Sequence, residues 1–372
     1  MVEWVRFQYE RNLFMELLSI ASCFALCGNG CEYRAFGSGH INETYIVRTD
    51  ADCKYILQKI NQYVFRNPQA VMENAIAITE FIRKKDADPR HALHFIQTKD
   101  GNYWYVDDHG DFWRMYDFME GFCLDQGGSL EDLYQGALAF GRFQMMLSDF
   151  PAATLHETIP NFHHTPNRFH QFRLSVEEDK AGRVGGVRDV IARLLQHEQL
   201  ACAPQQMLDA GQLPLRVAHN DTKLNNVLLD HDTRQCLCIL DLDTVMPGIS
   251  LYDFGDAIRF GAATGAEDTR DLDHMGIDLE AYRVYTHGFL ETATTLTGKE
   301  IELLHIGPIA VTLELVTRFL KDYLDGDLYF KTAYPEHNLV RSLAQLKLAE
   351  DMISKMDIMQ QIVCEELAKI RA

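Results

Sequence analysis

One short stretch constrains this chain more than any other, because it places polar groups between runs of apolar residues. Residues 217–218 and 227–229 are apolar and predict two short buried strands. The polar segment between them carries a carboxylate at Asp221 and an amide at Asn226. A further apolar run then ends directly before Asp241. The stretch therefore predicts two carboxylates and one amide at the ends of buried strands.

These groups are the ones that phosphoryl transfer from ATP requires. One carboxylate must accept the proton of the attacking hydroxyl, and further oxygen atoms must hold Mg²⁺ on the phosphates. The order His219-x-Asp221-x-x-x-x-Asn226, followed by a strand that ends at Asp241, is typical of the catalytic and metal-binding loops of protein-kinase-like folds. We therefore predict Asp221 as the catalytic base, Asn226 and Asp241 as Mg²⁺ ligands, and ATP as co-substrate.

Further strings extend this pattern over most of the chain. They lie at residues 37–42, 55–58, 162–163, 219–226, 241–244, 253–256, 318–319 and 334–339. With them the chain resembles the aminoglycoside phosphotransferase and choline kinase family of kinase-like folds, and within it the N-acetylhexosamine 1-kinases. The resemblance implies an ATP- and Mg²⁺-dependent kinase. It would phosphorylate the anomeric hydroxyl of GlcNAc or GalNAc to give the sugar 1-phosphate.

The resemblance assigns the sugar pocket to four residues besides Asp221. They are His40, Phe260, Arg318 and Tyr329. An aromatic ring can stack on a pyranose face, and an arginine can donate to sugar hydroxyls or to the acetamido oxygen. Without the resemblance, Phe260 would be interpreted as core and Arg318 as half of a helix ion pair.

The nucleotide site is expected in the first part of the chain. Glycines let a backbone approach phosphates, so Gly37-Ser38-Gly39 predicts a phosphate-binding hairpin. Kinases place a lysine or arginine on the following strand, but Gln58 stands at that position here, next to Lys59. Gln58 is expected to bind the nucleotide and Lys59 to face the solvent, and the sequence leaves open which residue contacts the phosphates in place of the lysine. Glu73 is the candidate helix partner of the phosphate-binding residue.

Three further positions follow from their place in the kinase pattern. Asp117-Phe118-Met119 is expected to be the hinge whose backbone contacts the adenine. Lys223 follows Asp221 closely and is predicted to neutralise charge on the transferred phosphate. His219 is expected to brace the catalytic loop. Asp243 could support the metal or cap the following turn, and the sequence leaves both open.

The periodicity of the apolar residues predicts an α+β fold, with a β-rich N-terminal lobe at 1–119 and a mainly α-helical lobe at 120–372. Helices are expected at 9–26 and 68–84. Strands are expected at 33–36, 45–47, 55–60, 92–96, 103–106 and 113–119, with a tight turn at Asp100-Gly101.

The composition narrows the partners. The net charge of −19 over 372 residues argues against nucleic acid and against anionic membrane surfaces. No window approaches the ~20 apolar residues of a membrane span. The nine cysteines show no disulfide framework, and no signal peptide opens the chain, so a cytoplasmic protein with reduced thiols is expected. The expected partners are a small sugar and ATP, and the expected state is a monomer, with an oligomer as the open alternative.

Other functions compete with this interpretation. A kinase of another small alcohol, such as choline, homoserine or an aminoglycoside, would use the same Asp221, Asn226 and Asp241. A nucleotide-binding pseudokinase is suggested only by Gln58. Metal binding by the cysteines at 23, 27 and 31 is disfavoured because the first two are expected to share one face of the opening helix. Metal binding by the histidines at 156, 163, 164 and 170 is disfavoured because their spacing fits no recognised site.

Overall fold

The computed structural model describes residues 15–37, 41–124 and 128–372. The chain divides into two compact units, which we call the sheet unit and the helical unit. The sheet unit comprises Met1–Gly121, His156–Ile159 and Leu240–Val245, and the helical unit comprises Phe122–Leu155, Pro160–Ile239 and Met246–Ala372. The predicted α+β, two-lobed kinase-like fold is confirmed. The sheet unit runs two residues past the predicted boundary and takes in two short later segments.

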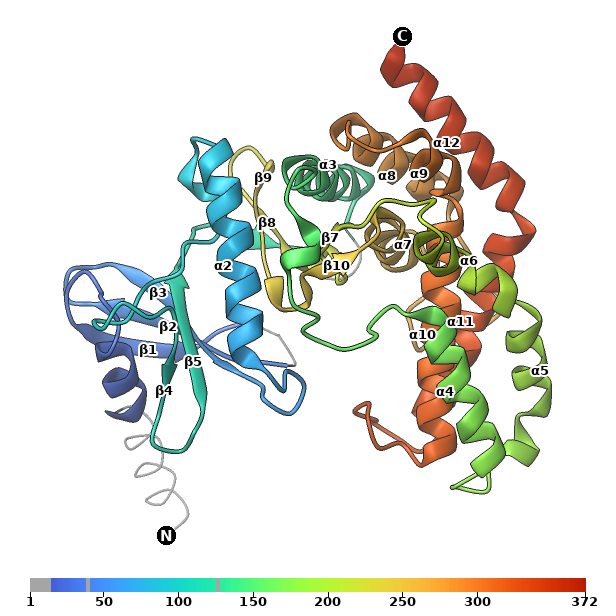
Figure 1. Ribbon diagram of the computed structural model, residues 1–372, viewed down its shortest axis with the longest axis horizontal. Helices are drawn as coiled ribbons and strands as arrows, with labels where there is room; N and C mark the ends of the chain where they lie inside the picture. Colours follow the sequence, from blue (N-terminus) through green and yellow to red (C-terminus); the bar gives the residue numbers. More distant parts are fainter. Residues whose placement is uncertain (1–14, 38–40, 125–127) are drawn as a thin grey trace. The chain divides into compact units, whose positions relative to one another are not determined.

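The sheet unit is built on an antiparallel sheet with the strand order β1-β2-β3-β5-β4 (Figure 1). Its inner face packs a core that includes Val47, Leu57, Trp113 and Met115. The hairpin and the third strand are found as predicted. The strands are β1 (Gly30–Ala35), β2 (Glu43–Thr49), β3 (Lys54–Ile60), β4 (Tyr105–Val106) and β5 (Phe112–Asp117).

The helix α2 (Pro68–Lys85) lies beside this sheet and confirms the predicted helix at 68–84. Asn67 caps it by accepting a hydrogen bond from the backbone N–H of Ala70, and Pro68 occupies the first turn, where no donor is needed. Basic residues fill the last turn, where they interact favourably with the partial negative charge at the C-terminal end of the helix dipole. Sequence therefore fixes both ends of α2 locally.

Two expectations in this unit are wrong. Residues 92–96 form no strand, because the outer edge of β5 is shared between this segment and β4. The segment makes only two ladder bonds there, from Ile96 N to Met115 O at 2.8 Å and from Asp117 N to His94 O at 3.1 Å. For the same reason β4 is shorter than the predicted 103–106. The turn is found, with Gly101 at a φ of 84°.

The opening helix ends earlier than expected. Its described part covers residues 15–22 and ends before Phe24, which instead forms an isolated bridge with Thr98. Residues 1–14 lie outside the described residues. The helix therefore ends four residues before the predicted end at residue 26.

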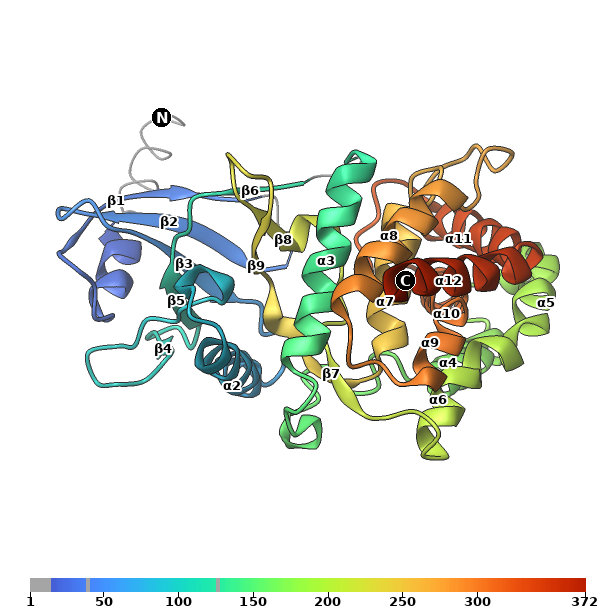
Figure 2. The same ribbon diagram turned by 90° about the horizontal axis from the view of Figure 1, so that it is seen from above.

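The helical unit is organised around α10, which is buried along most of its length and contacts α4, α6, α7 and α11 (Figure 2). Helix α3 packs along α8, and α12 packs on α8. The helices are α3 (Leu130–Met146), α4 (Thr165–Glu178), α5 (Arg188–Gln196), α6 (Glu198–Asp209), α7 (Ser250–Gly261), α8 (Leu279–Thr292), α9 (Gly298–Leu303), α10 (Ile306–Asp325), α11 (His337–Ser354) and α12 (Met356–Arg371).

Short strands carry the loops that bear the motif residues. The predicted strands at 217–218 and 227–229 are found as β7 and β8, and the apolar run before Asp241 forms β9. The strands of this unit are β6 (Phe122–Cys123), β7 (Arg216–Ala218), β8 (Val227–Leu229), β9 (Cys236–Ile239) and β10 (Met246–Gly248). β7 pairs with β10, and β8 lies between β6 and β9. All three residues of β8 are buried, as their apolar character predicts.

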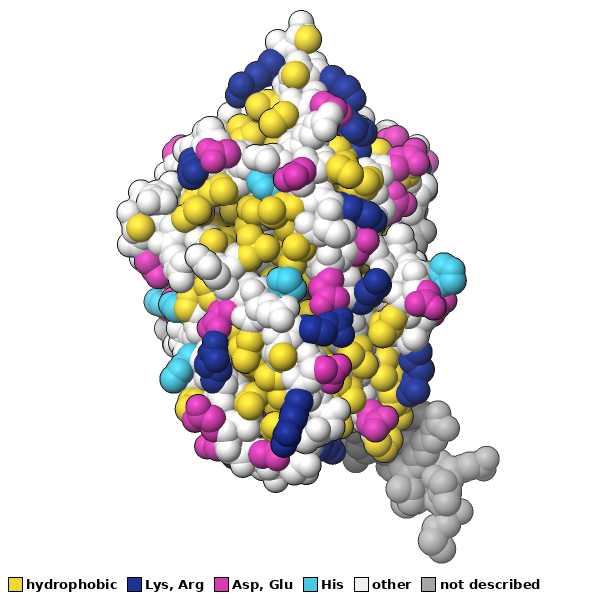
Figure 3. Space-filling view, turned by 90° about the vertical axis from the view of Figure 1, so that its right-hand side faces the viewer, with side chains coloured by type: hydrophobic (Ala, Val, Ile, Leu, Met, Phe, Trp, Pro, Cys, Tyr) yellow, Lys and Arg dark blue, Asp and Glu magenta, His cyan; other side chains and the backbone are white. Residues whose placement is uncertain are grey.

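The surface of the helical unit carries charges of both signs. On the face drawn in Figure 3, acidic and basic side chains are interspersed with apolar ones. The net negative charge is therefore not gathered into one acidic patch on this face. Among the described residues, no helix has both the length and the apolar character that crossing a membrane demands.

Candidate active site

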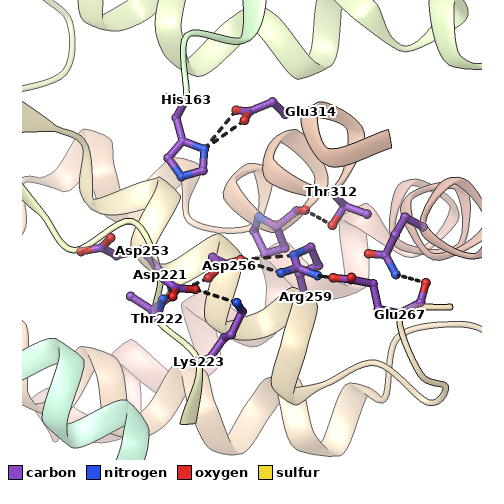
Figure 4. A network of polar contacts seen from close by, with 12 residues as sticks. His163, Asp221, Thr222, Lys223, Asp253, Asp256, Arg259, Glu267, Thr312 and Glu314 are labelled. Atoms are coloured by element: carbon purple, nitrogen blue, oxygen red, sulfur yellow. Dashed lines mark hydrogen bonds and ion pairs between the residues drawn. The ribbon is translucent and has the colours of Figure 1, made fainter. Parts of the chain in front are cut away.

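The loop between β7 and β8 brings together three of the predicted site residues. Lys223 Nζ lies 2.9 Å from Asp221 Oδ1 (Figure 4). Asn226 Nδ2 donates to Asp221 Oδ2 at 3.2 Å and to the Asp221 backbone carbonyl at 2.9 Å. The Asp221 side chain is 24% exposed. The loop therefore presents an oriented carboxylate that a small molecule can still reach.

Two carboxylates of α7 hold this loop from within the unit. Asp253 accepts the backbone N–H groups of His219 at 2.9 Å and Asn220 at 2.8 Å, and Asp256 accepts that of Thr222 at 3.0 Å. Residues three apart on a helix share one face, so both carboxylates can point at the loop. The backbone of Asn220 is left-handed, with a φ of 65°. Asparagine tolerates this conformation better than most residues, and the three bonds secure it.

The two α7 carboxylates have opposite electrostatic surroundings. Burial raises the pKa of Asp253, despite the hydrogen bonds that it accepts. Burial also acts to raise the pKa of Asp256, but the guanidinium of Arg259 and the ammonium of Lys223 outweigh it and lower that pKa. Asp221 in turn raises the pKa of Lys223. Positive charge is thus held next to Asp221 and Asp256, where an anionic phosphate would also be attracted.

Asn226 fits the predicted role of a metal ligand. Its amide nitrogen is used on Asp221, and within the described residues no hydrogen bond reaches its amide oxygen. A free amide oxygen beside a carboxylate is a donor set that Mg²⁺ accepts. His219 is fully buried against the rings of Phe140 and Phe143, as a residue that braces the loop would be.

The predicted metal loop belongs to the sheet unit and is held differently. Asp241 has a left-handed backbone with a φ of 53° and precedes a short 3₁₀ turn. The Asp243 carboxylate is 1% exposed and does not cap that turn. It accepts Arg114 Nη1 at 2.5 Å through Oδ1 and Asn42 Nδ2 at 2.7 Å through Oδ2. Asp243 therefore ties the loop to β5 and to the start of β2.

The predicted nucleotide-facing glutamine is part of the same network. Gln58 lies opposite Arg114 in the β3–β5 pairing, accepts a bond from Arg114 Nε at 2.9 Å and donates to Thr44 Oγ1 at 2.9 Å. Lys59 is less exposed than expected, because its ammonium lies 2.5 Å from Asp111. Glu73 pairs with His156 at 2.8 Å rather than with any residue of β3.

Sequence reasoning missed Arg114. Its signal was a cation inside an apolar strand, since β5 reads Phe-Trp-Arg-Met-Tyr-Asp and its first four residues are buried. Charged residues are almost never fully buried unless they are paired, so such a cation marks a partner or a ligand.

The remaining nucleotide positions are only partly described. Gly37 has a φ of 80°, which favours glycine, while Ser38, Gly39 and His40 lie outside the described residues. In the predicted hinge, Asp117 N and Phe118 N already donate to the carbonyls of His94 and Lys54. Among the described contacts, none uses the N–H of Met119. Met119 is therefore the hinge residue best able to donate to a base.

Two of the predicted sugar residues meet around one phenylalanine. The Arg318 guanidinium lies 5.6 Å from the centre of the Phe330 ring and 5.1 Å from that of Phe162. The Tyr329 ring packs edge-on against the Phe330 ring, with 4.8 Å between the ring centres, and Tyr329 is 57% exposed. Phe260 is half-buried at the end of α7, and no described contact joins it to this group. The structure thus brings Arg318 and Tyr329 together, but not Phe260.

His163 is a second residue that sequence reasoning did not assign to the site. Its Nδ1 lies 3.1 Å from Glu314 Oε2, and its Nε2 is buried with no partner among the described groups. Its ring points toward the region of Asp221 and Asp256 in Figure 4. Burial acts to raise the pKa of Glu314, but His163, Arg318 and Arg168 together lower it. No cluster of three metal-ligating residues occurs in the described ranges, so His163 forms no such group there.

Comparison with known proteins places this geometry in a family. The phosphotransferase enzyme family matches residues 32–285. One similar solved structure is a microcompartment-associated aminopropanol kinase, with 17% identity, a TM-score of 0.64 and coverage of 92% of this chain and 98% of that chain. A second is an aminoglycoside phosphotransferase from Alicyclobacillus acidocaldarius, with 12% identity, a TM-score of 0.63 and coverage of 93% and 96%. A third is an amicoumacin kinase in complex with AMP-PNP, Ca²⁺ and Ami, with 11% identity, a TM-score of 0.60 and coverage of 93% and 96%. At these identities the similarity establishes the fold.

Proposed function

The chain belongs to the phosphotransferase enzyme family, and on that premise we propose that it transfers the γ-phosphoryl group of ATP to the anomeric hydroxyl of an N-acetylhexosamine. The observation that carries the proposal is the Asp221 carboxylate, partly exposed and oriented by Lys223 and Asn226. Phosphoryl transfer depends mainly on positioning and on charge stabilisation, and this loop supplies both.

The proposed reaction needs one proton acceptor. The anomeric oxygen forms a bond to the γ-phosphorus while the bond from that phosphorus to the β–γ bridging oxygen breaks, and ADP leaves. Asp221 accepts the hydroxyl proton as the new bond forms. Lys223 stabilises the negative charge that spreads over the transferred phosphoryl group. The α7 carboxylates keep the loop rigid throughout, because they bind its backbone rather than its reacting side chains.

Mg²⁺ would be held by the oxygen atoms of Asn226 and Asp241, and when bound it supplies positive charge that neutralises the phosphates. Both residue types are hard oxygen donors. The left-handed backbone at Asp241 supports the proposal, since strained conformations concentrate at functional positions.

The proposed acceptor is a neutral sugar. The exposed Tyr329 ring offers a stacking surface, and Arg318 offers donors that suit hydroxyl and acetamido oxygens. Two buried carboxylates lie next to this group: Glu314, on which His163, Arg318 and Arg168 act, and Asp322, which is engaged by the backbone N–H groups of Tyr329 and Phe330. A carboxylate with two arginines beside it gives little attraction to a cationic acceptor. This balance favours an N-acetylhexosamine over an amino alcohol or an aminoglycoside.

Purified protein incubated with Mg-ATP and a panel of acceptors tests the proposal. The panel contains N-acetylglucosamine, N-acetylgalactosamine, glucose, aminopropanol, choline and kanamycin, and the readouts are ADP release and the ³¹P spectrum of the product. We expect an anomeric phosphate from the acetylated sugars only. Phosphorylation of an amino alcohol or of kanamycin would retain the kinase and reject the sugar. Release of ADP without phosphorylation of any acceptor in the panel would reject the sugar as well as the amino alcohols and kanamycin.

A further inference from the structure

Strand β3 lacks the cation that a kinase uses to hold ATP. In protein kinases a lysine on this strand contacts the α- and β-phosphates and pairs with a glutamate of the neighbouring helix. Gln58 occupies that place here, and both ends of its amide are bonded within the sheet. Lys59 alternates to the other face of the strand and pairs with Asp111. Neither residue of β3 therefore fills the role.

Arg114 supplies a cation on the same face of the sheet. It is the direct partner of Gln58 across β3 and β5, and paired residues of adjacent strands project to one side. Its side chain is 4% exposed and is held by Gln58 Oε1 at Nε and by Asp243 Oδ1 at Nη1. The described contacts place nothing polar on Nη2, which leaves that nitrogen to donate to a ligand.

The carboxylate that pairs with the proposed phosphate-binding cation also comes from a different element than in protein kinases. The helix glutamate at position 73 pairs with His156, whereas Arg114 pairs with Asp243. Asp243 stands two residues after the proposed metal ligand Asp241. Burial acts to lower the pKa of Arg114, but Asp243 outweighs it and raises that pKa, and the nearby Asp241 carboxylate contributes to the rise. The arginine is therefore near the residue at which the metal and the phosphates are expected.

We infer that Arg114 is the nucleotide-binding cation of this enzyme, positioned by Gln58 and Asp243, and that it donates to the α- or β-phosphate of ATP. The inference rests on the proposed ATP-dependent activity and concerns only its nucleotide half. A planar guanidinium that is already fixed at two nitrogens can donate from the third without further ordering. The arginine on β5 and the aspartate after Asp241 thus replace the lysine on β3 and the glutamate on the helix.

The competing explanation is that the ion pair of Arg114 and Asp243 only stabilises the fold. The two explanations are distinguished by comparing ADP, which carries phosphates, with adenosine, which carries none. A residue that contacts phosphate affects the binding of ADP and leaves that of adenosine unchanged. A residue that only supports the fold affects both ligands alike. The affinities of ADP and adenosine are therefore measured for the unaltered protein and for Arg114→Gln, with the melting temperature followed in parallel.

We expect Arg114→Gln to weaken ADP binding by about tenfold or more, since charge-assisted hydrogen bonds to phosphate are lost. Adenosine affinity should stay within about twofold. Lys59→Gln is the matched control, because it removes the neighbouring cation on the other face of the strand, and it should leave both affinities unchanged. Equal weakening of ADP and adenosine by Arg114→Gln, or no weakening of either, would overturn the inference.

A measurement on the unaltered chain covers the case in which Arg114→Gln does not fold. In ¹⁵N-arginine-labelled protein, the Arg114 Nε–H signal is identified by its absence from Arg114→Lys, which keeps the buried charge. That signal should shift on addition of ADP and stay in place on addition of adenosine. An Arg114 Nε–H signal that does not shift when ADP binds would overturn the inference. An unaltered protein that binds no ADP would instead reject the proposed function itself.

Discussion

The two carboxylate-bearing loops of this chain are held in contrasting ways. The loop of Asp221 is fixed through its backbone, because Asp253 accepts the N–H groups of residues only 33 and 34 positions earlier. The loop of Asp241 is fixed through a side chain, because Asp243 binds Arg114 at a separation of 129 residues and Asn42 at 201. The first loop depends on one helix of its own unit, and the second on one buried ion pair of the sheet unit.

The contrast separates two kinds of preorganisation. Backbone bonds fix a loop whatever its exposed side chains are, so replacement of the Asp221 side chain leaves the bonds that hold the loop in place. A side-chain anchor couples the Asp241 loop to β5 and to the start of β2, so changes there should affect the nucleotide as well as the loop. Substitutions in the two loops are therefore expected to differ in which measured property they change.

Apart from replacement of the proposed base Asp221, Asp241→Asn should have the largest effect. Removal of a charged metal ligand is expected to lose several kcal/mol of transition-state stabilisation, which corresponds to a roughly 10³-fold slower turnover. The Mg²⁺ concentration that gives half-maximal rate should also rise, and a magnesium titration of the steady-state rate measures both. Asp232→Asn, in an exposed turn of the helical unit, is the control and should behave as the unaltered enzyme. An unchanged magnesium requirement in Asp241→Asn would remove Asp241 from the metal site.

Asp256→Asn tests the helix brace through stability. Among the described residues, the change leaves Glu267 as the remaining carboxylate partner of the buried Arg259, and it should cost about 3 kcal/mol of unfolding free energy. The pKa of Asp256 is below its ordinary value of 3.8, so its stabilising charge is fully present above that pH and is lost only as the pH falls through the lower, folded value. Urea unfolding between pH 7 and pH 4.5 should therefore give a constant loss.

Asp253→Asn should show the opposite pH response and a smaller loss, about 1–2 kcal/mol at pH 7, because an amide cannot accept all three of the hydrogen bonds that Asp253 receives. Burial raises the pKa of Asp253 above 3.8, so the folded state holds that proton more tightly than the unfolded state. The unaltered protein then gains stability from this group as the pH falls toward 4, and the uncharged variant does not. As the pH falls from 7 to 4.5, the loss of unfolding free energy in Asp253→Asn should therefore grow, while the loss in Asp256→Asn stays constant. Losses that depend on pH in the same way in both variants would contradict the opposite pKa shifts of the two carboxylates.

Arg318→Met should have the smallest effect and should affect the acceptor only. Methionine retains apolar contact with the rings of Phe162 and Phe330 while the donors disappear. We expect the KM for the sugar to rise about tenfold, with kcat and the KM for ATP nearly unchanged. Arg193→Met, which removes an arginine that pairs with Glu350 on another helix, is the control. A fall in kcat without a change in the sugar KM would contradict the assignment.

Sequence could predict the features that are local. The motif around Asp221 and the strands that flank it follow from residues close together in the chain, and the structure brings Asp221, Lys223 and Asn226 together as expected. The helix α2 was equally predictable, since Asn67 and Pro68 mark its start. Hydrophobic periodicity, helix caps and short motifs each depend on residues that are close together in the chain, so the sequence alone reveals them.

Features that depend on distant partners escaped prediction. The segment at 92–96 alternates like a strand, but whether it pairs is decided by β4 and β5, which share the available edge. The role of Arg114 depends on Asp243, and that of His163 on Glu314 at a separation of 151 residues. Arg318 was assigned from a resemblance, while the ring of Phe330 that lies under it was not foreseen.

Turnover and ADP affinity of Asp221→Asn test the central claim most directly. The account predicts a turnover lower by about 10²–10⁴-fold, the usual contribution of a general base. ADP affinity should remain within about twofold of that of the unaltered protein, because the loop is held by backbone bonds that the substitution leaves in place. Near-native turnover in Asp221→Asn would contradict the claim that this carboxylate accepts the hydroxyl proton.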